Sequence, residues 1–333
     1  MSIGASFDSE EIGVTRTTAK QWVTTVSTSL NTSHEKMCLD LDGIRVHCLL
    51  LLARQTTAVD ADTVCLSSGA VVRRAMHMGL HIDPIHHPAY STMSPVEVES
   101  RRRLWATVLE LDIQSSMDCG NFPLIDIEYY NCRLPSNVHD GGQPESTSPI
   151  PSPSMSPKPM DTFTPCSIQI LLIITIPVRT KRLPTAKPLP HSPSPQRRAL
   201  RHAENLLCLS RCIPHEQIAA FTIPDKLYNL SIHRFFLALH NPFALRAMTD
   251  PTFYFSRKLC LETSLALFQD RAHSESDDVY RLRLLGSAIF HDAYIQSAIH
   301  LCSELRTQYI EAGPFSTSSG NIIERNTILS ALT

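Results

Sequence analysis

Apolar residues recur at helical spacing along most of this chain, and the pattern predicts helices joined by turns. Over residues 41–55 the apolar side chains share one helical face: Leu41, Ile44, Cys48, Leu51 and Leu52. A second helix is predicted from about Ala61 to Met78, because Gly79 followed by Leu80 suits a left-handed C-terminal cap. No stretch alternates apolar and polar residues between hairpin turns, so the predicted fold class is all-α.

The best-marked helix start lies at Ser94. Ser94 suits the N-cap, Pro95 the first helical position and Glu97 the returning carboxylate of a capping box. A buried stripe then follows at helical spacing: Leu104, Val108 and Leu111. Gly120 is predicted to end this helix.

The helical pattern returns in the last third of the chain. One helix is predicted over Asp225–Leu239, ending at the His-Asn-Pro sequence that contains Pro242, because a proline disfavours helix at the residue before it. Asp250 is the predicted cap of the next helix. Weaker apolar patterns predict a helix over Arg198–Arg211 and a long one over Val279–Leu305 with one break.

Residues 141–200 interrupt this pattern. They hold 13 of the 23 prolines and seven basic residues against two acidic ones. Ordering a segment of that length costs about 60–120 kcal/mol in backbone entropy, and its apolar residues, crowded into Ile168–Val178, are too few to offset that cost. We therefore predict a multi-helix bundle interrupted by a long Pro/Ser-rich disordered segment. The division is an N-terminal helical half (1–140), this linker (141–200) and a C-terminal helical half (201–333). The segment suits a genuine linker and a mis-spliced, translated intron equally well.

Composition and charge narrow the class of protein. Of the 333 residues, 43% are hydrophobic and the formal net charge is −2, which excludes a wholly disordered chain and one built to coat nucleic acid. The first residues lack a secretory signal, and no apolar run approaches the roughly 20 residues of a membrane span. We expect an intracellular protein with reduced cysteines and no membrane partner.

Catalytic motifs are not found. The chain has no G-x-x-x-x-G-K, G-x-G-x-x-G or G-x-S-x-G sequence, so nucleotide binding and the usual hydrolase elbow are unsupported. His77 and His81 have zinc-ligand spacing, but Gly79 is predicted to end the helix between them. We expect no enzyme, no catalytic residue, no metal site and no cofactor in this chain. A helical metal-dependent enzyme using His77, His81 or His86 is the less favoured alternative.

The chain has three clusters of basic residues. Arg101–Arg103 is partly neutralised by nearby glutamates and is interpreted as a solvated helix face. Arg179–Arg182 and the trio Arg197, Arg198 and Arg201 lie in or beside the linker, where they could act as a weak nuclear-import signal.

Several short motifs occur in a specific order and spacing. They are Gly79–His81, Arg102–Trp105, Asp112, Gly120–Pro123 and Leu134–Asn137, followed later by Leu239–Phe243 and Ser256–Glu262. Together they resemble the fungal-specific transcription factor domain, the middle regulatory region of fungal zinc binuclear cluster transcription factors. The resemblance covers roughly residues 20–140 and 220–310.

The residues that carry the resemblance are predicted to be structural. Trp105 on the well-capped helix is the expected core anchor. Arg102 or Arg103, together with Asp112, is expected to tie that helix to a neighbour through ion pairs. Gly79, Pro123 and Pro242 are assigned turn or helix-end roles.

The resemblance implies a nuclear regulator of RNA polymerase II transcription. Family members bind zinc through an N-terminal six-cysteine cluster, but this chain has no C-x-x-C sequence. Promoter DNA is therefore an expected partner only where missing sequence or another protein supplies that cluster. Co-regulators, a small-molecule effector and a homodimer are the other candidate partners. The alternative is a stand-alone helical module that binds a partner or effector and never touches DNA.

Overall fold

The computed structural model describes residues 16–32, 40–57, 59–138, 157–159, 162, 164–180, 222–269, 291–312 and 319–332. Over these residues the chain is helical and contains no strand, which confirms the all-α prediction. The helices are α1 (Arg16–Thr32), α2 (Leu41–Thr57), α3 (Val64–His77), α4 (Pro95–Asp118), α5 (Pro165–Arg179), α8 (Thr222–Ala244), α9 (Tyr254–Gln269), α11 (His291–Ala312) and α12 (Ser319–Leu332). Short 3-10 turns join several of them: Ala61–Thr63, Pro84–His86, Pro88–Tyr90, Ile127–Tyr129, η7 (Leu245–Met248) and η8 (Pro251–Phe253).

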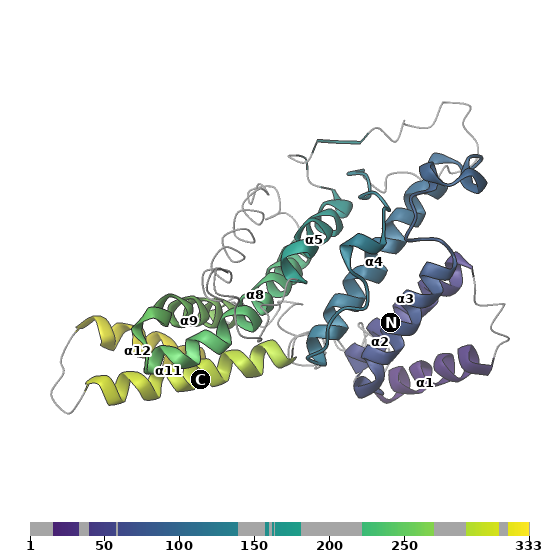
Figure 1. Ribbon diagram of the computed structural model, residues 1–333. Helices are drawn as coiled ribbons and strands as arrows, with labels where there is room; N and C mark the ends of the chain where they lie inside the picture. Colours follow the sequence, from purple (N-terminus) through teal and green to yellow (C-terminus); the bar gives the residue numbers. More distant parts are fainter. Residues whose placement is uncertain are drawn as a thin grey trace.

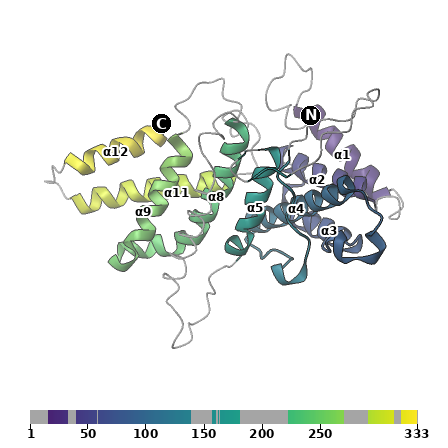
Figure 2. The same ribbon diagram turned by 90° about the horizontal axis from the view of Figure 1, so that it is seen from above.

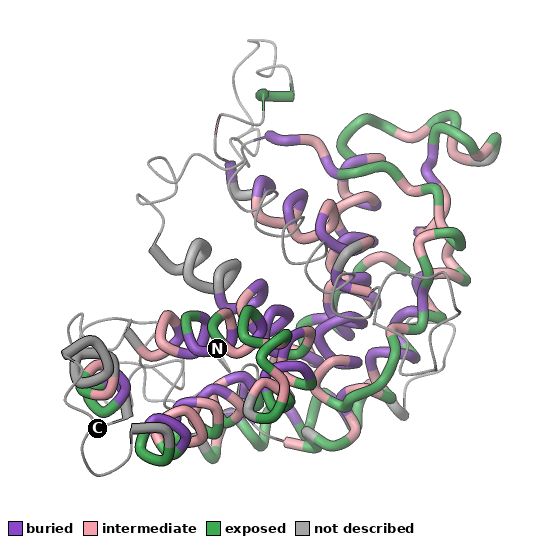
Figure 3. The backbone as a smooth tube through the Cα atoms, turned by 60° about the vertical axis from the view of Figure 1, so that its left-hand side comes forward, coloured by how far each residue is buried: buried purple, intermediate pink, exposed green. Residues whose placement is uncertain are grey.

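The helices form an elongated body with α5 and α8 near its middle (Figures 1 and 2). Helices α1 to α4 lie at one end, and α9, α11 and α12 lie at the other. In Figure 3 the central helices are mostly buried or half-buried, whereas exposed positions follow the outer helices and loops. Among the described residues, no helix has both the length and the apolar character needed to cross a membrane.

Of the apolar clusters in the described residues, two lie on opposite sides of α8. The first joins α2, α3, α4, α5 and one face of α8, and its buried members include Ile44, Leu51, Val72, Leu80, Trp105, Val108, Leu171, Ile176, Phe235 and Phe236. The second lies between α8 and α9, with Tyr294 of α11 packed against it, and a neighbouring cluster joins α9, α11 and α12. Leu230, Leu237 and Ala244 enter the second core from α8 at intervals of seven residues, so they share the other helical face. Helix α8 therefore buries two faces.

Gly79 ends α3 as predicted. Its φ of +70° lies in the left-handed region that favours glycine. The N–H of Gly79 donates to the carbonyl of Met76 at 2.9 Å, and the N–H of Leu80 donates to the carbonyl of Ala75 at 3.0 Å. These two bonds form a Schellman motif, and the trailing Leu80 is buried in the first core.

A side chain at residue 79 is expected to destabilise the protein more than one at residue 120. Gly120 ends α4 with a φ of +68°, but nothing lies within 4 Å of the Cβ that alanine would add there. At Gly79 the same Cβ would meet the Tyr90 hydroxyl at 2.9 Å. Gly120→Ala should therefore cost the left-handed strain alone, about 1–2 kcal/mol, and Gly79→Ala should cost more. Chemical denaturation of both variants measures the difference, and equal losses would contradict it.

The predicted start of α4 is confirmed in full. The Ser94 hydroxyl accepts from the N–H of Glu97, and the Glu97 carboxylate accepts from the N–H of Ser94 at 2.8 Å. Pro95 occupies the first helical position. The helix ends at Asp118, and Gly120 closes it as predicted.

The prediction that residues 141–200 lack structure throughout is wrong for Pro165–Arg179, which form α5. Thr164 and Ser167 make a capping box at its start, and Pro177 is confined to its last turn. Helix α5 buries Leu171 and Ile176 in the first core and packs against both α4 and α8. Apolar burial against two other helices supplies the stabilisation that composition alone could not reveal.

Two further predictions about the last third need correction or lie outside the described residues. Helix α8 does not stop at Pro242 but continues to Ala244, because buried Phe243 stacks on Phe253 at 5.8 Å while Pro242 stays exposed. Asp250 caps a 3-10 turn that leads directly into α9. The helix predicted over Arg198–Arg211 and the stretch 270–290 fall outside the described residues. Helices α1 and α12 were not predicted.

Candidate regulatory interface

The three consecutive arginines of α4 do not form a solvated face, contrary to the prediction. Arg101 is buried, donates to the carbonyl of Met78 at 2.7 Å and lies over the Tyr90 ring at 4.5 Å. Arg103 pairs with Glu99 one turn earlier at 3.1 Å. Arg102 reaches across to a loop. The three side chains point to different partners because neighbouring positions on a helix diverge by about 100°.

Arg102 forms a bidentate ion pair with Asp83, a residue that the sequence analysis did not single out. The Arg102 Nε and Nη2 atoms donate to the two Asp83 carboxylate oxygens at 2.8 and 2.9 Å. Asp83 is fully buried and also accepts from the backbone N–H groups of Arg133 and Ile85. Burial alone would raise the pKa of Asp83, but these donors together lower it below its ordinary value. The carboxylate thus joins α4 to the segments before and after it.

The Leu134–Asn137 motif is also fixed by hydrogen bonds to side chains. The N–H of Ser136 donates to both oxygens of Glu99 at 2.9 and 3.1 Å. The side-chain Oδ1 atom of Asn137 accepts from the hydroxyls of Thr164 and Ser167 at 2.6 and 2.8 Å. Asn137 therefore connects the loop after α4 to the N-terminus of α5 across the proline-rich segment.

Trp105 and Asp112 lie further along α4. Trp105 is 2% exposed, and its ring meets Tyr130 edge-on at 5.7 Å and His81 at 6.2 Å. Asp112 does not take the predicted ion-pair role in the described residues. Its carboxylate accepts instead from the N–H of Leu124 at 2.8 Å, and burial raises its pKa. Half-buried Pro123 precedes that captured N–H.

A polar row runs along the face of α4 that meets α5 and α8. Glu110, Gln114 and Asp118 are spaced by four residues, so they lie on one face of the helix. The Gln114 side-chain amide donates to Glu110 at 2.6 Å. The row presents acceptors to the two neighbouring helices, and each helix supplies one arginine to it.

Arg179 approaches this row from the end of α5. It donates to the two Glu110 oxygens at 2.8 and 2.5 Å, its side chain has 0% exposure, and it lies over the Phe235 ring of α8 at 4.9 Å. Burial would raise the pKa of Glu110, but Arg179 holds it below its ordinary value. Arg179 is therefore not free to act as part of the predicted nuclear-import signal.

Arg234 approaches the row from α8. It is 4% exposed, donates to the Gln114 side-chain oxygen, and pairs with Asp118. The pKa of Asp118 is nonetheless raised, because burial and the nearby Asp292 of α11 outweigh the attraction of Arg234. The hydrogen-bonded chain therefore runs from α5 through α4 to α8, close to the start of α11.

We call these five residues the arginine interface: Glu110, Gln114, Asp118, Arg179 and Arg234. Buried ion pairs are weak contributors to net stability, since the loss of hydration offsets most of their attraction. They do restrict the geometry of the elements they join, because a displaced partner leaves an uncompensated charge. The interface joins the N-terminal helices to the helix that begins the C-terminal core.

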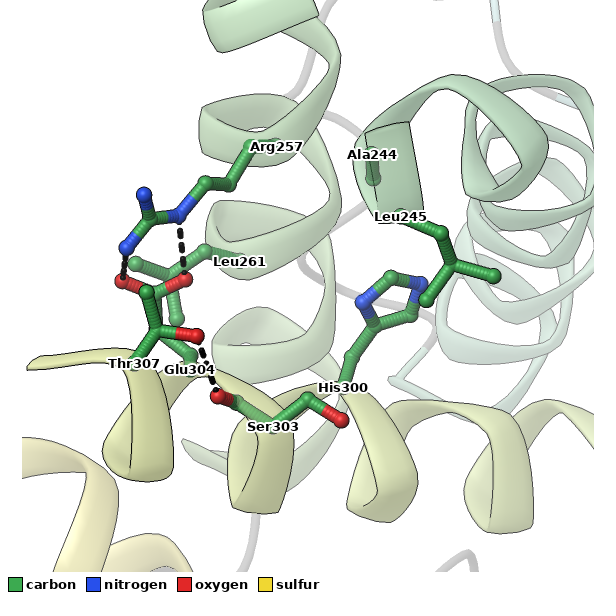
Figure 4. Close-up of a pocket in the computed structure, with 8 residues that line it drawn as sticks. All are labelled: Ala244, Leu245, Arg257, Leu261, His300, Ser303, Glu304 and Thr307. Atoms are coloured by element: carbon green, nitrogen blue, oxygen red, sulfur yellow. Dashed lines mark hydrogen bonds and ion pairs between the residues drawn. The ribbon is translucent and has the colours of Figure 1, made fainter. Parts of the chain in front are cut away.

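A small pocket lies in the C-terminal core (Figure 4). It has an empty volume of about 370 Å³ with its open mouth included, and its lining comes from the end of α8, η7, α9 and α11: Ala244, Leu245, Arg257, Leu261, His300, Ser303, Glu304 and Thr307. Arg257 and Glu304 form a bidentate pair across it at 2.8 Å. The Nε2 atom of His300 is buried without a hydrogen-bond partner, and burial lowers the pKa of His300.

No group of three or more potential metal ligands occurs within the part of the chain that the structure describes. The histidines considered for zinc have other surroundings. His81 packs against Trp105, and the His87 ring lies on Tyr90 at 4.7 Å. His86 is exposed in a 3-10 turn, and His77 is exposed at the end of α3.

Sequence inspection did not identify Asp83 and Arg234, the partners of Arg102 and of the polar row of α4. The spacing of Glu110, Gln114 and Asp118 was a readable signal for a polar helix face. Nothing local identified Asp83 or Arg234, because their partners lie 19 residues away in one case and more than 110 in the other.

The sequence of this chain is similar to those of several known proteins. A family model described as "Fungal specific transcription factor domain" matches residues 1–216. Transcription factor lepE of Aspergillus flavus is 33% identical over 85% of this chain and 34% of its own length. Transcription factor opdR of Penicillium oxalicum is 34% identical over 89% of this chain and 39% of its own length.

A third relative matches a shorter stretch. The C6 finger domain transcription factor hasF of Aspergillus fumigatus is 39% identical over 30% of this chain and 13% of its own length. The chain spans between a third and two fifths of the length of lepE and opdR. No solved structure matches it.

Proposed function

The chain belongs to the fungal-specific transcription factor domain family, and we propose that it acts in the nucleus as the regulatory region of a zinc-cluster regulator of RNA polymerase II transcription. Its relatives are named transcription factors, and transcription factors of this kind are not enzymes. In this role the helical body transmits a regulatory state rather than carrying out a reaction.

The arginine interface is the observation that supports a transmitting role. It is the place where helices from both halves of the chain meet through charges that are mostly buried. An ion-pair network of this kind holds one arrangement of α4, α5 and α8 and penalises others, because a shift would leave Arg179 or Arg234 buried without its acceptor. A ligand or co-regulator that favours a different arrangement would act through that penalty.

Removing Arg234 is expected to change transcriptional output without abolishing the fold. The whole chain is fused to a heterologous DNA-binding domain, and transcription from a reporter is measured. The fusion should shift reporter output severalfold relative to the DNA-binding domain alone, and Arg234→Met should alter that shift. A circular dichroism melt of the variant confirms that it still folds.

Lys258→Met is the matched control. Lys258 pairs with Glu262 at 3.8 Å on the exposed surface of α9, where both side chains are about 60% exposed. Removing a surface charge of this kind should leave reporter output unchanged. The proposal fails if the folded fusion does not affect the reporter, or if the two variants behave alike.

DNA contact is proposed only through a zinc cluster outside this sequence. Salt-dependent binding of the full native regulator to its promoter, with no binding by this chain alone, would support that division of labour. The alternative from sequence, a stand-alone module that never touches DNA, is favoured if the native transcript encodes no such cluster. Long-read sequencing of the transcript upstream of Met1 separates the two.

Among the described residues, the pocket between α9 and α11 is the place that we propose for a small-molecule effector, another candidate partner. Its lining combines three apolar residues with the Arg257–Glu304 ion pair and the unpaired Nε2 atom of His300. The pocket lies beside the second core, to which α8 contributes residues. The same helix supplies Arg234 to the arginine interface. An effector bound there would act on α8 directly.

A further inference from the structure

Two cysteines meet where α3 begins and α4 ends. Cys65 is the second residue of α3, and Cys119 is the C-cap residue of α4, held by the turn at Gly120. The two helices pack against each other along their length. Residues 54 positions apart in sequence are thereby placed side by side, at an end of the helix pair that faces solvent.

Their contacts are specific. Burial raises the pKa of the Cys119 thiol, and the neighbouring Cys65 thiol raises it further. The Asn121 side-chain amide donates to the Cys65 sulfur at 3.7 Å. The backbone N–H of Cys65, in the first turn of α3, offsets only part of the rise in the pKa of Cys119.

The pair also differs in exposure from the three buried cysteines of the described residues. Cys119 is exposed and Cys65 half-buried, whereas Cys48, Cys166 and Cys260 are buried. Burial raises the pKa of Cys48 and Cys260 to about 12, which keeps those thiols protonated and unreactive. Among the described residues, Cys65 and Cys119 thus combine accessibility with a second thiol nearby.

We propose that Cys65 and Cys119 are a reversible dithiol–disulfide site, oxidised by exchange with a small disulfide such as glutathione disulfide. The Cys119 thiolate attacks one sulfur of glutathione disulfide, forming a mixed disulfide and releasing one glutathione thiolate. The Cys65 thiolate then attacks the Cys119 sulfur and releases the second glutathione thiolate. Two protein thiols lose two electrons and two protons, and one glutathione disulfide becomes two glutathione molecules.

The location gives the exchange a route to the arginine interface. Cys119 directly follows Asp118, the partner of Arg234 on α8. A bond from Cys119 to the first turn of α3 would fix the end of α4 against α3. The position of Asp118 relative to α3 would then be fixed. Because Asp118 pairs with Arg234, oxidation would favour one arrangement of α4 and α8.

The test is exchange of the purified whole chain with a glutathione redox buffer under native conditions, at pH 8. Burial and the neighbouring Cys65 raise the pKa of Cys119, so alkaline buffer and long incubation supply enough thiolate. After alkylation of free thiols and digestion without reductant, mass spectrometry should find the peptides of Cys65 and Cys119 joined and about 2 Da lighter than their sum. Reductant should release them.

Three single variants make the outcome decisive. In Cys65→Ser, Cys119 should stop at the glutathione mixed disulfide, because no second thiol resolves it. Cys119→Ser should abolish the cross-link. Cys302→Ser, at an exposed cysteine of α11, should leave it unchanged. The proposal is overturned if wild-type Cys119 accumulates as the mixed disulfide, or if it remains unmodified while Cys302 reacts.

Discussion

Replacing Trp105 with alanine is expected to lower the free energy of unfolding by about 3–5 kcal/mol, the cost of removing a buried aromatic from a packed core. Trp105 is 2% exposed and lies where α4 meets the loop residues Tyr130 and His81. Its ring fills the middle of the first core, and surrounding helices held by several ion pairs have little freedom to collapse into the cavity. Chemical denaturation followed by circular dichroism measures the loss.

The other tryptophan provides the matched control. Trp22 on α1 is 41% exposed, so Trp22→Ala removes a similar volume from the surface rather than from the core. Its effect should be a small fraction of that of Trp105→Ala. Equal effects of the two substitutions, or an unchanged melt for Trp105→Ala, would refute the anchor role.

Replacing Asp83 with alanine is the second large effect, with an expected loss of about 3–5 kcal/mol, because it leaves the guanidinium of Arg102 without its counter-charge. Asp83 is fully buried and the Arg102 side chain is 12% exposed, so water cannot fully compensate. The backbone N–H groups of Arg133 and Ile85 also lose their acceptor. The double variant Asp83→Ala/Arg102→Met should lose less than Asp83→Ala, since it removes the stranded charge.

An exposed aspartate–arginine pair tests whether burial is the cause. Asp42 and Arg45 pair on the surface of α2, with side chains 80% and 45% exposed. Asp42→Ala should change stability very little. If both aspartate variants lose the same amount, burial does not determine the cost.

The dependence of the free energy of unfolding on pH, measured in acid, tests the role of Asp83 independently. Its folded-state pKa lies below its ordinary value, so the stability it contributes is fully present above the unfolded pKa, near 4. That contribution is lost as pH falls through the lower, folded pKa. The difference between wild type and Asp83→Ala should therefore shrink in acid, whereas a purely steric effect would be independent of pH.

The parts of the fold that the sequence predicted are those with local signals. Ser94, Pro95 and Glu97 interact within one helical turn, and the turn at Gly79 needs only the bonds of its own helix end. The failures have tertiary causes. Helix α5 forms because α4 and α8 cover its apolar residues, and α8 continues through Pro242 because Phe243 finds Phe253. Neither covering surface can be read from the segment itself.

The arginine interface likewise has a local part that the sequence predicts and a tertiary part that it does not. The spacing of Glu110, Gln114 and Asp118 shows that they share a helix face, but not that the face is buried. The two arginines that meet it lie in different segments, one of them in sequence that composition marks as disordered. Composition averages over residues 141–200 and so hides a fifteen-residue helix within them.

The two buried faces of α8 bear on where this protein can be divided. The family match ends at residue 216, before α8 begins at Thr222. A fragment cut at that boundary would lack Phe235 and Phe236 from its core and would leave Asp118 without Arg234. A fragment that extends only to Ala244 would instead expose Leu230 and Leu237 to solvent, because it lacks α9. The smallest piece that can fold alone is therefore larger than the family match, and the autonomous unit includes the C-terminal helices.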